Sequence, residues 1–137
     1  MGNEIVYDNV KFWLDHHVIH CRIKNNINEE FSKIEFEDLF IKIISTLTYG
    51  NYKPVLIDLT DLSYLNALSV FKTISRSIRI KSTVLSKTFL VQSIDLKLLL
   101  SLYNFGNDSV VPNKISTNYN VALKYSNETY EQFNASY

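Results

Sequence analysis

The chain has few of the residues that mark exported, nucleotide-binding or nucleic-acid-binding proteins. Only one of its 137 residues is cysteine, Cys21, so it forms no internal disulfide and a reducing cytoplasm is the expected location. Its three glycines form no glycine-rich phosphate loop, which argues against nucleotide-dependent catalysis. Lys plus Arg and Asp plus Glu each total 14, so no excess of positive charge points to nucleic acid as a partner.

Long hydrophobic runs are also missing. The longest apolar stretch, 96–103, is interrupted by Lys97 and Ser101 and falls short of the roughly 20 residues that a membrane span needs. Residues 1–4 lack the basic and apolar regions of a signal peptide. We therefore expect no membrane span and one folded domain over residues 1–137, with the tail 127–137 left unassigned.

Alternating apolar and polar residues dominate the first part of the chain. Over 5–24 this alternation surrounds Asp15-His16-His17, which predicts a β-hairpin with its turn at those residues. Because side chains alternate along a strand, the second arm has a buried side and an opposite side. The expected buried set is Ile19, Cys21 and Ile23, and the opposite set is Val18, His20 and Arg22.

Helical and strand patterns alternate after the hairpin. A helix is predicted over about 28–49, starting at Asn28 or at the capping box of Ser32 and ending at Gly50. The short apolar run 54–59 predicts a central strand, and Asn66 can cap the following helix. The expected inward residues of that helix are Ala67, Val70, Phe71, Ile74 and Ile78.

The last third repeats the strand and helix pattern. A strand is predicted over 88–91 and a helix from a Ser93 cap to Gly106, with Leu96, Leu99, Leu100 and Tyr103 inward. An edge segment over 110–115 and a helix capped by Thr117 follow. This order predicts an α/β fold, a mixed sheet with an N-terminal β-hairpin and crossover helices packed on it.

Three segments carry a resemblance to a known family. They are Val55-Leu56-Ile57-Asp58-Leu59-Thr60-Asp61-Leu62, Leu90-Val91-Gln92-Ser93, and Val111-Pro112 with Ala122-Leu123-Lys124-Tyr125. The chain resembles the STAS fold of bacterial anti-sigma-factor antagonists, and more closely the small STAS/SEC14-like proteins of bacteria. The resemblance implies a STAS-like domain. In the antagonists, a serine at the start of the helix after the central strand is phosphorylated and switches the partner. Here Ala67 stands at that position and Asn66 stands where the family has aspartate, so we expect no such switch.

Two groups of residues suggest chemistry. The cluster Asp15-His16-His17 with His20 and Cys21 contains metal-ligand types, but its spacing matches no zinc pattern and strand geometry separates the side chains, so we expect no metal. Asp58 and Asp61 follow the central strand, at the edge where open α/β sheets bind ligands. The interpretation that we favour for both is a hydrogen bond to local backbone amides.

Basic residues gather on one face of the second predicted helix and in the loop after it, and could meet an acidic partner or an anionic surface, although we favour a solvated helix face. The set is Lys72, Arg76, Arg79, Lys81 and Lys87.

The expected function follows from the family resemblance and the missing catalytic motifs. We predict a non-enzymatic interaction module without a cofactor, which binds a protein partner or pairs with itself as a homodimer. The predicted partner-binding residues are Asp58, Thr60, Asp61, Ser63, Asn66, Ala67 and Ser69. The alternative is a domain that binds a small apolar or lipid-like ligand between helices and sheet.

Overall fold

The structure, a computed structural model, describes residues 4–7, 9–24, 33–104 and 113–135. These residues form a six-stranded sheet in which neighbours in sequence are neighbours in space. The strands are β1 (Glu4–Tyr7), β2 (Val10–Asp15), β3 (Val18–Ile23), β4 (Val55–Asp58), β5 (Lys87–Leu90) and β6 (Asn113–Ser116). The first three pair antiparallel and the rest run parallel to β3, which confirms the predicted α/β class with a mixed sheet.

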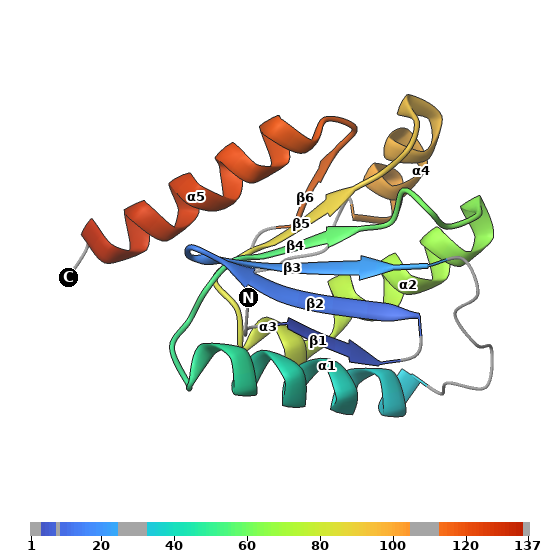
Figure 1. Cartoon of the computed structure of the whole chain (residues 1–137). Coiled ribbons are helices and arrows are strands. Elements are labelled where there is room, and N and C mark those ends of the chain that lie inside the picture. Colours follow the sequence, from blue (N-terminus) through green and yellow to red (C-terminus); the bar gives the residue numbers. More distant parts are fainter. Residues whose placement is uncertain (1–3, 8, 25–32, 105–112, 136–137) are drawn as a thin grey trace.

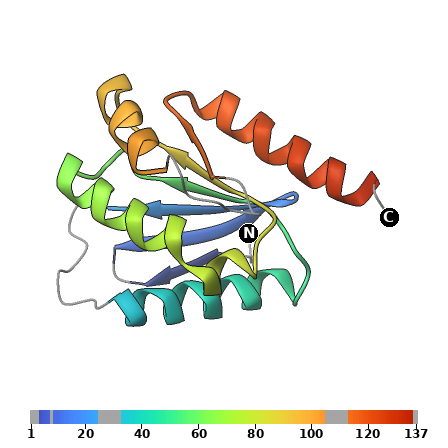
Figure 2. The ribbon, with the colours of Figure 1, turned by 180° about the vertical axis from the view of Figure 1, so that it is seen from behind.

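Helices cover the two faces of the sheet unequally (Figures 1 and 2). The helices are α1 (Lys33–Thr48), α2 (Tyr64–Arg76), α3 (Ile78–Lys81), α4 (Ile94–Asn104) and α5 (Tyr119–Ala135). The first four lie in crossovers between sequential parallel strands, and right-handed crossovers in that order place all of them on one face. We call this the helix-layer face. Helix α5 follows the last strand and crosses the opposite face, the α5 face.

The core divides along the alternation of the strands. Ile57 and Phe89 point to the helix-layer face, where the ring of Phe89 meets that of Phe71 edge-on with centroids 4.7 Å apart. Ile19, Cys21 and Ile23 share that face, as the alternation predicts. A smaller cluster on the α5 face joins β3, β4 and β5 to α5. It contains Val18, Leu56, Leu90 and Ala122.

The first arm of the predicted hairpin is two strands rather than one. β1 and β2 pair antiparallel, and between them the sequence has Asp8 and Asn9, residue types that favour turns. The turn between β2 and β3 lies where it was predicted, with His16 in a left-handed conformation (φ 56°). At the end of α1, Tyr49 and Gly50 both have positive φ, so the helix ends where Gly50 predicts. The predicted start at residues 28–32 lies outside the described residues.

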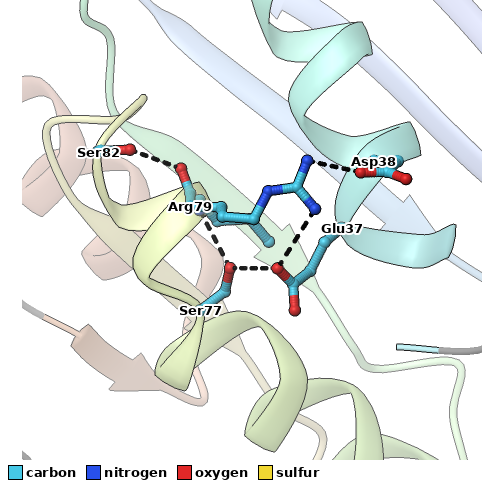
Figure 3. Close-up of polar contacts among 6 residues, drawn as sticks. Glu37, Asp38, Ser77, Arg79 and Ser82 are labelled. Atoms are coloured by element: carbon cyan, nitrogen blue, oxygen red, sulfur yellow. Dashed lines mark hydrogen bonds and ion pairs between the residues drawn. The ribbon is translucent and has the colours of Figure 1, made fainter. Parts of the chain in front are cut away.

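The predicted helix with the inward set ending at Ile78 is interrupted, which corrects the assignment of that residue. Ser77 has an extended backbone that ends α2, and its Oγ accepts a hydrogen bond from the Ile80 N–H at the start of α3. Ser77 also donates to Glu37 of α1 (3.1 Å), and Arg79 pairs with Glu37 and Asp38 (Figure 3). This polar junction fixes α3 against α1. Ile80 is buried, whereas Ile78 is 76% exposed.

Lys87 does not lie on the solvated basic surface that was expected from the sequence. It is a fully buried residue of β5, on the helix-layer face, and its Nζ donates to the Ser75 carbonyl oxygen of α2 (3.2 Å). Burial, with a smaller repulsion from Lys81, lowers the pKa of Lys87 to about 8. Arg79 is engaged at the α1 junction, so the five basic residues do not form one free surface.

Helix α5 is longer than the sequence pattern predicts. It begins after Asn118, whose Oδ1 accepts a hydrogen bond from the Val121 N–H (3.1 Å), so Asn118 and not Thr117 acts as the capping residue. The helix continues through the unassigned tail to Ala135. β6 is an edge strand, as predicted for 110–115, although 110–112 lie outside the described residues. Within the described part of the chain, no helix has both the length and the apolarity to cross a membrane.

Candidate interaction surface

The turn after β4 uses its polar side chains locally. Asp58 Oδ1 accepts hydrogen bonds from the N–H of Thr60 (2.9 Å) and from its hydroxyl (2.6 Å). The second oxygen of Asp58 lies 3.9 Å from Arg22 Nε on the neighbouring strand. The carboxylate of Asp58 thus shapes the turn, which is the local role that we favoured from the sequence. Asp61 is exposed at the outside of the same turn.

Ser63, not Asn66, is the capping residue of α2. Ser63 has an extended backbone and its Oγ accepts a hydrogen bond from the Asn66 N–H (3.2 Å), which places Asn66 inside the first turn of the helix. Ala67 is fully buried in the core, so its methyl group is out of reach of a partner that docks on the folded domain. Ser69 is exposed on α2. Of the predicted partner-binding residues, Ala67 alone is wholly enclosed.

Three apolar side chains form an exposed row along α4. Ile94, Leu98 and Leu102 are 68%, 59% and 74% exposed. They recur every four residues, so they share one side of the helix, while Leu96 and Leu100 face the core. Helix α4 thus presents apolar side chains outward as well as inward, although Lys97 and Ser101 are exposed too. Exposed apolar patches are typical of interaction sites.

The start of α2 extends this apolar row. Leu65 is 80% exposed, and Tyr64 beside it is 43% exposed. The hydroxyl of Tyr64 is hydrogen-bonded to Ser93, which precedes α4 and caps it through the Leu96 N–H. The beginnings of α2 and α4 are therefore fixed side by side. We call the surface formed by Leu65, Lys72, Arg76, Ile94, Asp95, Leu98 and Leu102 the α2/α4 surface.

Charge is unequally distributed along the α2/α4 surface. Asp95 is exposed in the first turn of α4. At the other end, Lys72 Nζ and the guanidinium of Arg76 lie over the ring of Tyr103, at 4.2 Å and 6.0 Å from its centroid. Asp95 thus lies at one end of the surface and Lys72 and Arg76 at the other, with the apolar row between them, and the exposed Lys97 precedes Leu98 on α4.

The histidine cluster does not come together as a metal site. His16 is exposed in the turn, His17 stacks on Tyr130 of α5 with centroids 4.2 Å apart, and Cys21 points to the opposite face of the sheet from His20. Within the described residues, no three His, Cys, Asp or Glu side chains are placed to hold one ion.

His20 instead joins β3 to α5. Its ring stacks on Trp13 (centroids 4.9 Å apart) and its Nε2 is hydrogen-bonded to the Tyr119 hydroxyl (3.0 Å). His20 is only 2% exposed, and burial is the main reason that its pKa lies below the usual histidine value of 6.5. Burial, and then Asp15 and Asp58, raise the pKa of Tyr119. These shifts keep both rings neutral at pH 7, and the pair acts as a structural clasp.

An open hollow of about 470 Å³ lies at the other end of α5. Its lining residues are Gly50, Asn51, Tyr52, Lys53, Tyr130, Phe133 and Asn134. Lys53 Nζ lies over the ring of Tyr130, 5.2 Å from its centroid. The hollow is therefore on the α5 side of the molecule and not between the crossover helices and the sheet, where the ligand alternative was expected.

Comparisons with models of known protein families, with curated proteins and with solved structures found no match to this chain. The partner-binding residues predicted from the sequence lie in the turn after β4 and in the first turns of α2, and they do not include the row on α4. A signal was present, because Ile94, Leu98 and Leu102 follow the same four-residue spacing on the side opposite Leu96 and Leu100.

Proposed function

We propose that this chain is a non-enzymatic, STAS-like protein-interaction module that docks its partner on the α2/α4 surface. The observation that carries the proposal is the exposed apolar row on α4, continued by Leu65 on α2. Four exposed aliphatic side chains on two adjoining helices gain free energy when a partner removes them from water.

The STAS-like part of the proposal rests on the resemblance and on element order. The chain follows β4 with a short turn and α2, and the parallel strands alternate with helices in the order on which the resemblance was based. The site lies close to the segment by which the antagonists contact partners, but its chemistry differs. Ala67 is buried and has no hydroxyl, so the proposed docking is apolar and independent of phosphorylation.

Site-specific photo-cross-linking tests this function. A benzoylphenylalanine replacing Leu65 would stand at the rim of the α2/α4 surface, and one replacing Ile78 gives a matched control on α3, because Ile78 is equally apolar and 76% exposed. Irradiation in expressing cells is expected to give a discrete product from position 65 and none from position 78. Absence of a product from position 65, or the same product from both positions, contradicts the proposal.

A second candidate function is binding of a small ligand in the hollow beside α5. The hollow is large enough for one, since small-molecule sites span about 300–1,000 Å³. Tyr52 and Phe133 offer ring contacts and Lys53 a positive charge. Native mass spectrometry of the purified chain is expected to show a retained mass that disappears in the Phe133→Ala variant. A spectrum of the bare chain alone contradicts this candidate.

A further inference from the structure

The charges on the α2/α4 surface indicate which partner it accepts. We infer that the α2/α4 surface pairs with the same surface of a second copy, with the two α4 helices antiparallel. This inference rests on the proposed function and names the partner. It does not use any residue of the turn after β4.

The directions of α2 and α4 favour an antiparallel pairing. α2 and α4 both follow parallel strands and lie side by side, so both begin at the end of the surface that holds Leu65 and Asp95. Both run towards the end where Lys72 and Arg76 flank Tyr103. Consider a two-fold axis that lies in the plane of contact and is perpendicular to the helices. It places the Asp95 end of one copy against the Lys72 and Arg76 end of the other.

The side chains of the two copies are complementary in this pairing. In that arrangement, with the axis near Leu98, Ile94 of one copy meets Leu102 of the other, and the two Leu98 side chains meet each other. Asp95 of each copy then approaches the Lys72 and Arg76 end of its partner. Opposite charges meet twice, whereas a parallel arrangement would bring like charges together. Antiparallel helices also oppose their macrodipoles favourably.

The size of the surface sets the expected strength. α2 has 13 residues, which corresponds to a length of about 20 Å. Two adjoining helices are about 20 Å wide, so each copy contributes about 400 Å², roughly half the area per partner of a standard interface. We therefore expect a reversible dimer with a dissociation constant between about 1 µM and about 1 mM.

A charge-exchange experiment tests this pairing. Sedimentation equilibrium of the full chain, up to about 1 mM, is expected to show a monomer–dimer equilibrium. Asp95→Lys alone, and Lys72→Glu with Arg76→Glu, should each weaken self-association by about tenfold or more. An equimolar mixture of the two variants should form a heterodimer of about wild-type strength, because both contacts then join opposite charges. Unchanged thermal melts would show that each variant is folded.

Three results would overturn the inference. They are a wild-type chain that stays monomeric at the highest concentration, a dimer that the separate charge variants do not weaken, and a mixture that fails to recover association. The outcome of cross-linking at position 65 separates this inference from the proposed function. A product with a mass other than two copies would leave protein docking intact and reject self-pairing, whereas no product would reject both.

Discussion

The two faces of the sheet are built differently although they share the same strands. On the helix-layer face, apolar residues from β2 to β6 and from four helices form one continuous cluster. On the α5 face, a single helix covers the sheet, the apolar cluster is small, and polar contacts such as His20 with Tyr119 join helix to sheet. The larger apolar cluster is on the helix-layer face, and the outer side of that same helix layer carries the exposed row of α4.

The largest expected difference between the faces is in how much a buried side chain stabilises the fold. It can be measured in β4, where adjacent residues point to opposite faces. Ile57 and Leu56 are both at most 1% exposed, but Ile57 belongs to the large cluster and Leu56 to the small one. We expect Ile57→Ala to lower the free energy of unfolding by about 3–5 kcal/mol, and Leu56→Ala by about 2–3 kcal/mol, since α5 can close over the cavity. Urea unfolding measures both. A larger loss for Leu56→Ala would contradict the comparison.

Lys87 is a charged side chain buried on the helix-layer face. Below its pKa of about 8, the buried ammonium is charged and destabilises the fold. Replacement by methionine, which has a similar shape, should raise the free energy of unfolding at pH 7 by about 1–3 kcal/mol.

The greater stability expected for Lys87→Met should also depend on pH, which gives a second check. Between about pH 8 and the unfolded-state value of 10.5, the unfolded chain holds more protons at Lys87 than the folded chain, so wild-type stability rises with pH relative to Lys87→Met. The gap between the two proteins should therefore narrow from pH 8 to pH 10. A gap that is constant with pH would contradict the burial of a charged Lys87.

Breaking the contact between His20 and Tyr119 on the α5 face should have a smaller effect on the free energy of unfolding. Tyr119→Phe removes the hydroxyl that is hydrogen-bonded to His20 and should cost about 1 kcal/mol at pH 7. Acid should weaken the same clasp. The pKa of His20 is lowered in the fold, so as pH falls below 6.5 the unfolded chain takes up a proton that the folded chain resists, and stability decreases. Unfolding of wild type and His20→Gln at pH 7 and at pH 5.5 measures this, and an equal loss in both proteins would contradict it.

The sequence predicted the secondary-structure elements best where the spacing of apolar residues was consistent with only one kind of element. Alternation in β3 identified the faces of Cys21 and His20 correctly, and the run 54–59 marked the central strand. Local capping chemistry was less decisive, because Ser63 and Asn66 are both good caps and only the backbone conformation selects Ser63. At the break after α2, Ser77 also contacts Glu37, 40 residues away in the chain, and no local pattern contains that contact.

The candidate site was also only partly predictable, because it too depends on packing between segments that are far apart in the chain. The turn at Asp58 was identified from its place after a central strand, and its local hydrogen bond to Thr60 agrees with the interpretation that we favoured. The exposed row on α4 was missed because an apolar residue in a leucine-rich helix reads as core until the packing partners of each side are known. His20 is buried because α5 returns over the sheet, which the pattern within β3 cannot reveal.

The most direct test of docking on the α2/α4 surface is to make the same substitution at two exposed aliphatic residues, one on that surface and one away from it. Leu98→Asp changes the middle of the α2/α4 surface and Ile78→Asp changes α3, and both side chains are more than half exposed, so we expect the free energy of unfolding to change by less than about 0.5 kcal/mol in each. Sedimentation equilibrium should show that Leu98→Asp abolishes the self-association of the chain, whereas Ile78→Asp leaves it unchanged. Equal association of the two variants, at equal stability, would contradict self-pairing through the α2/α4 surface.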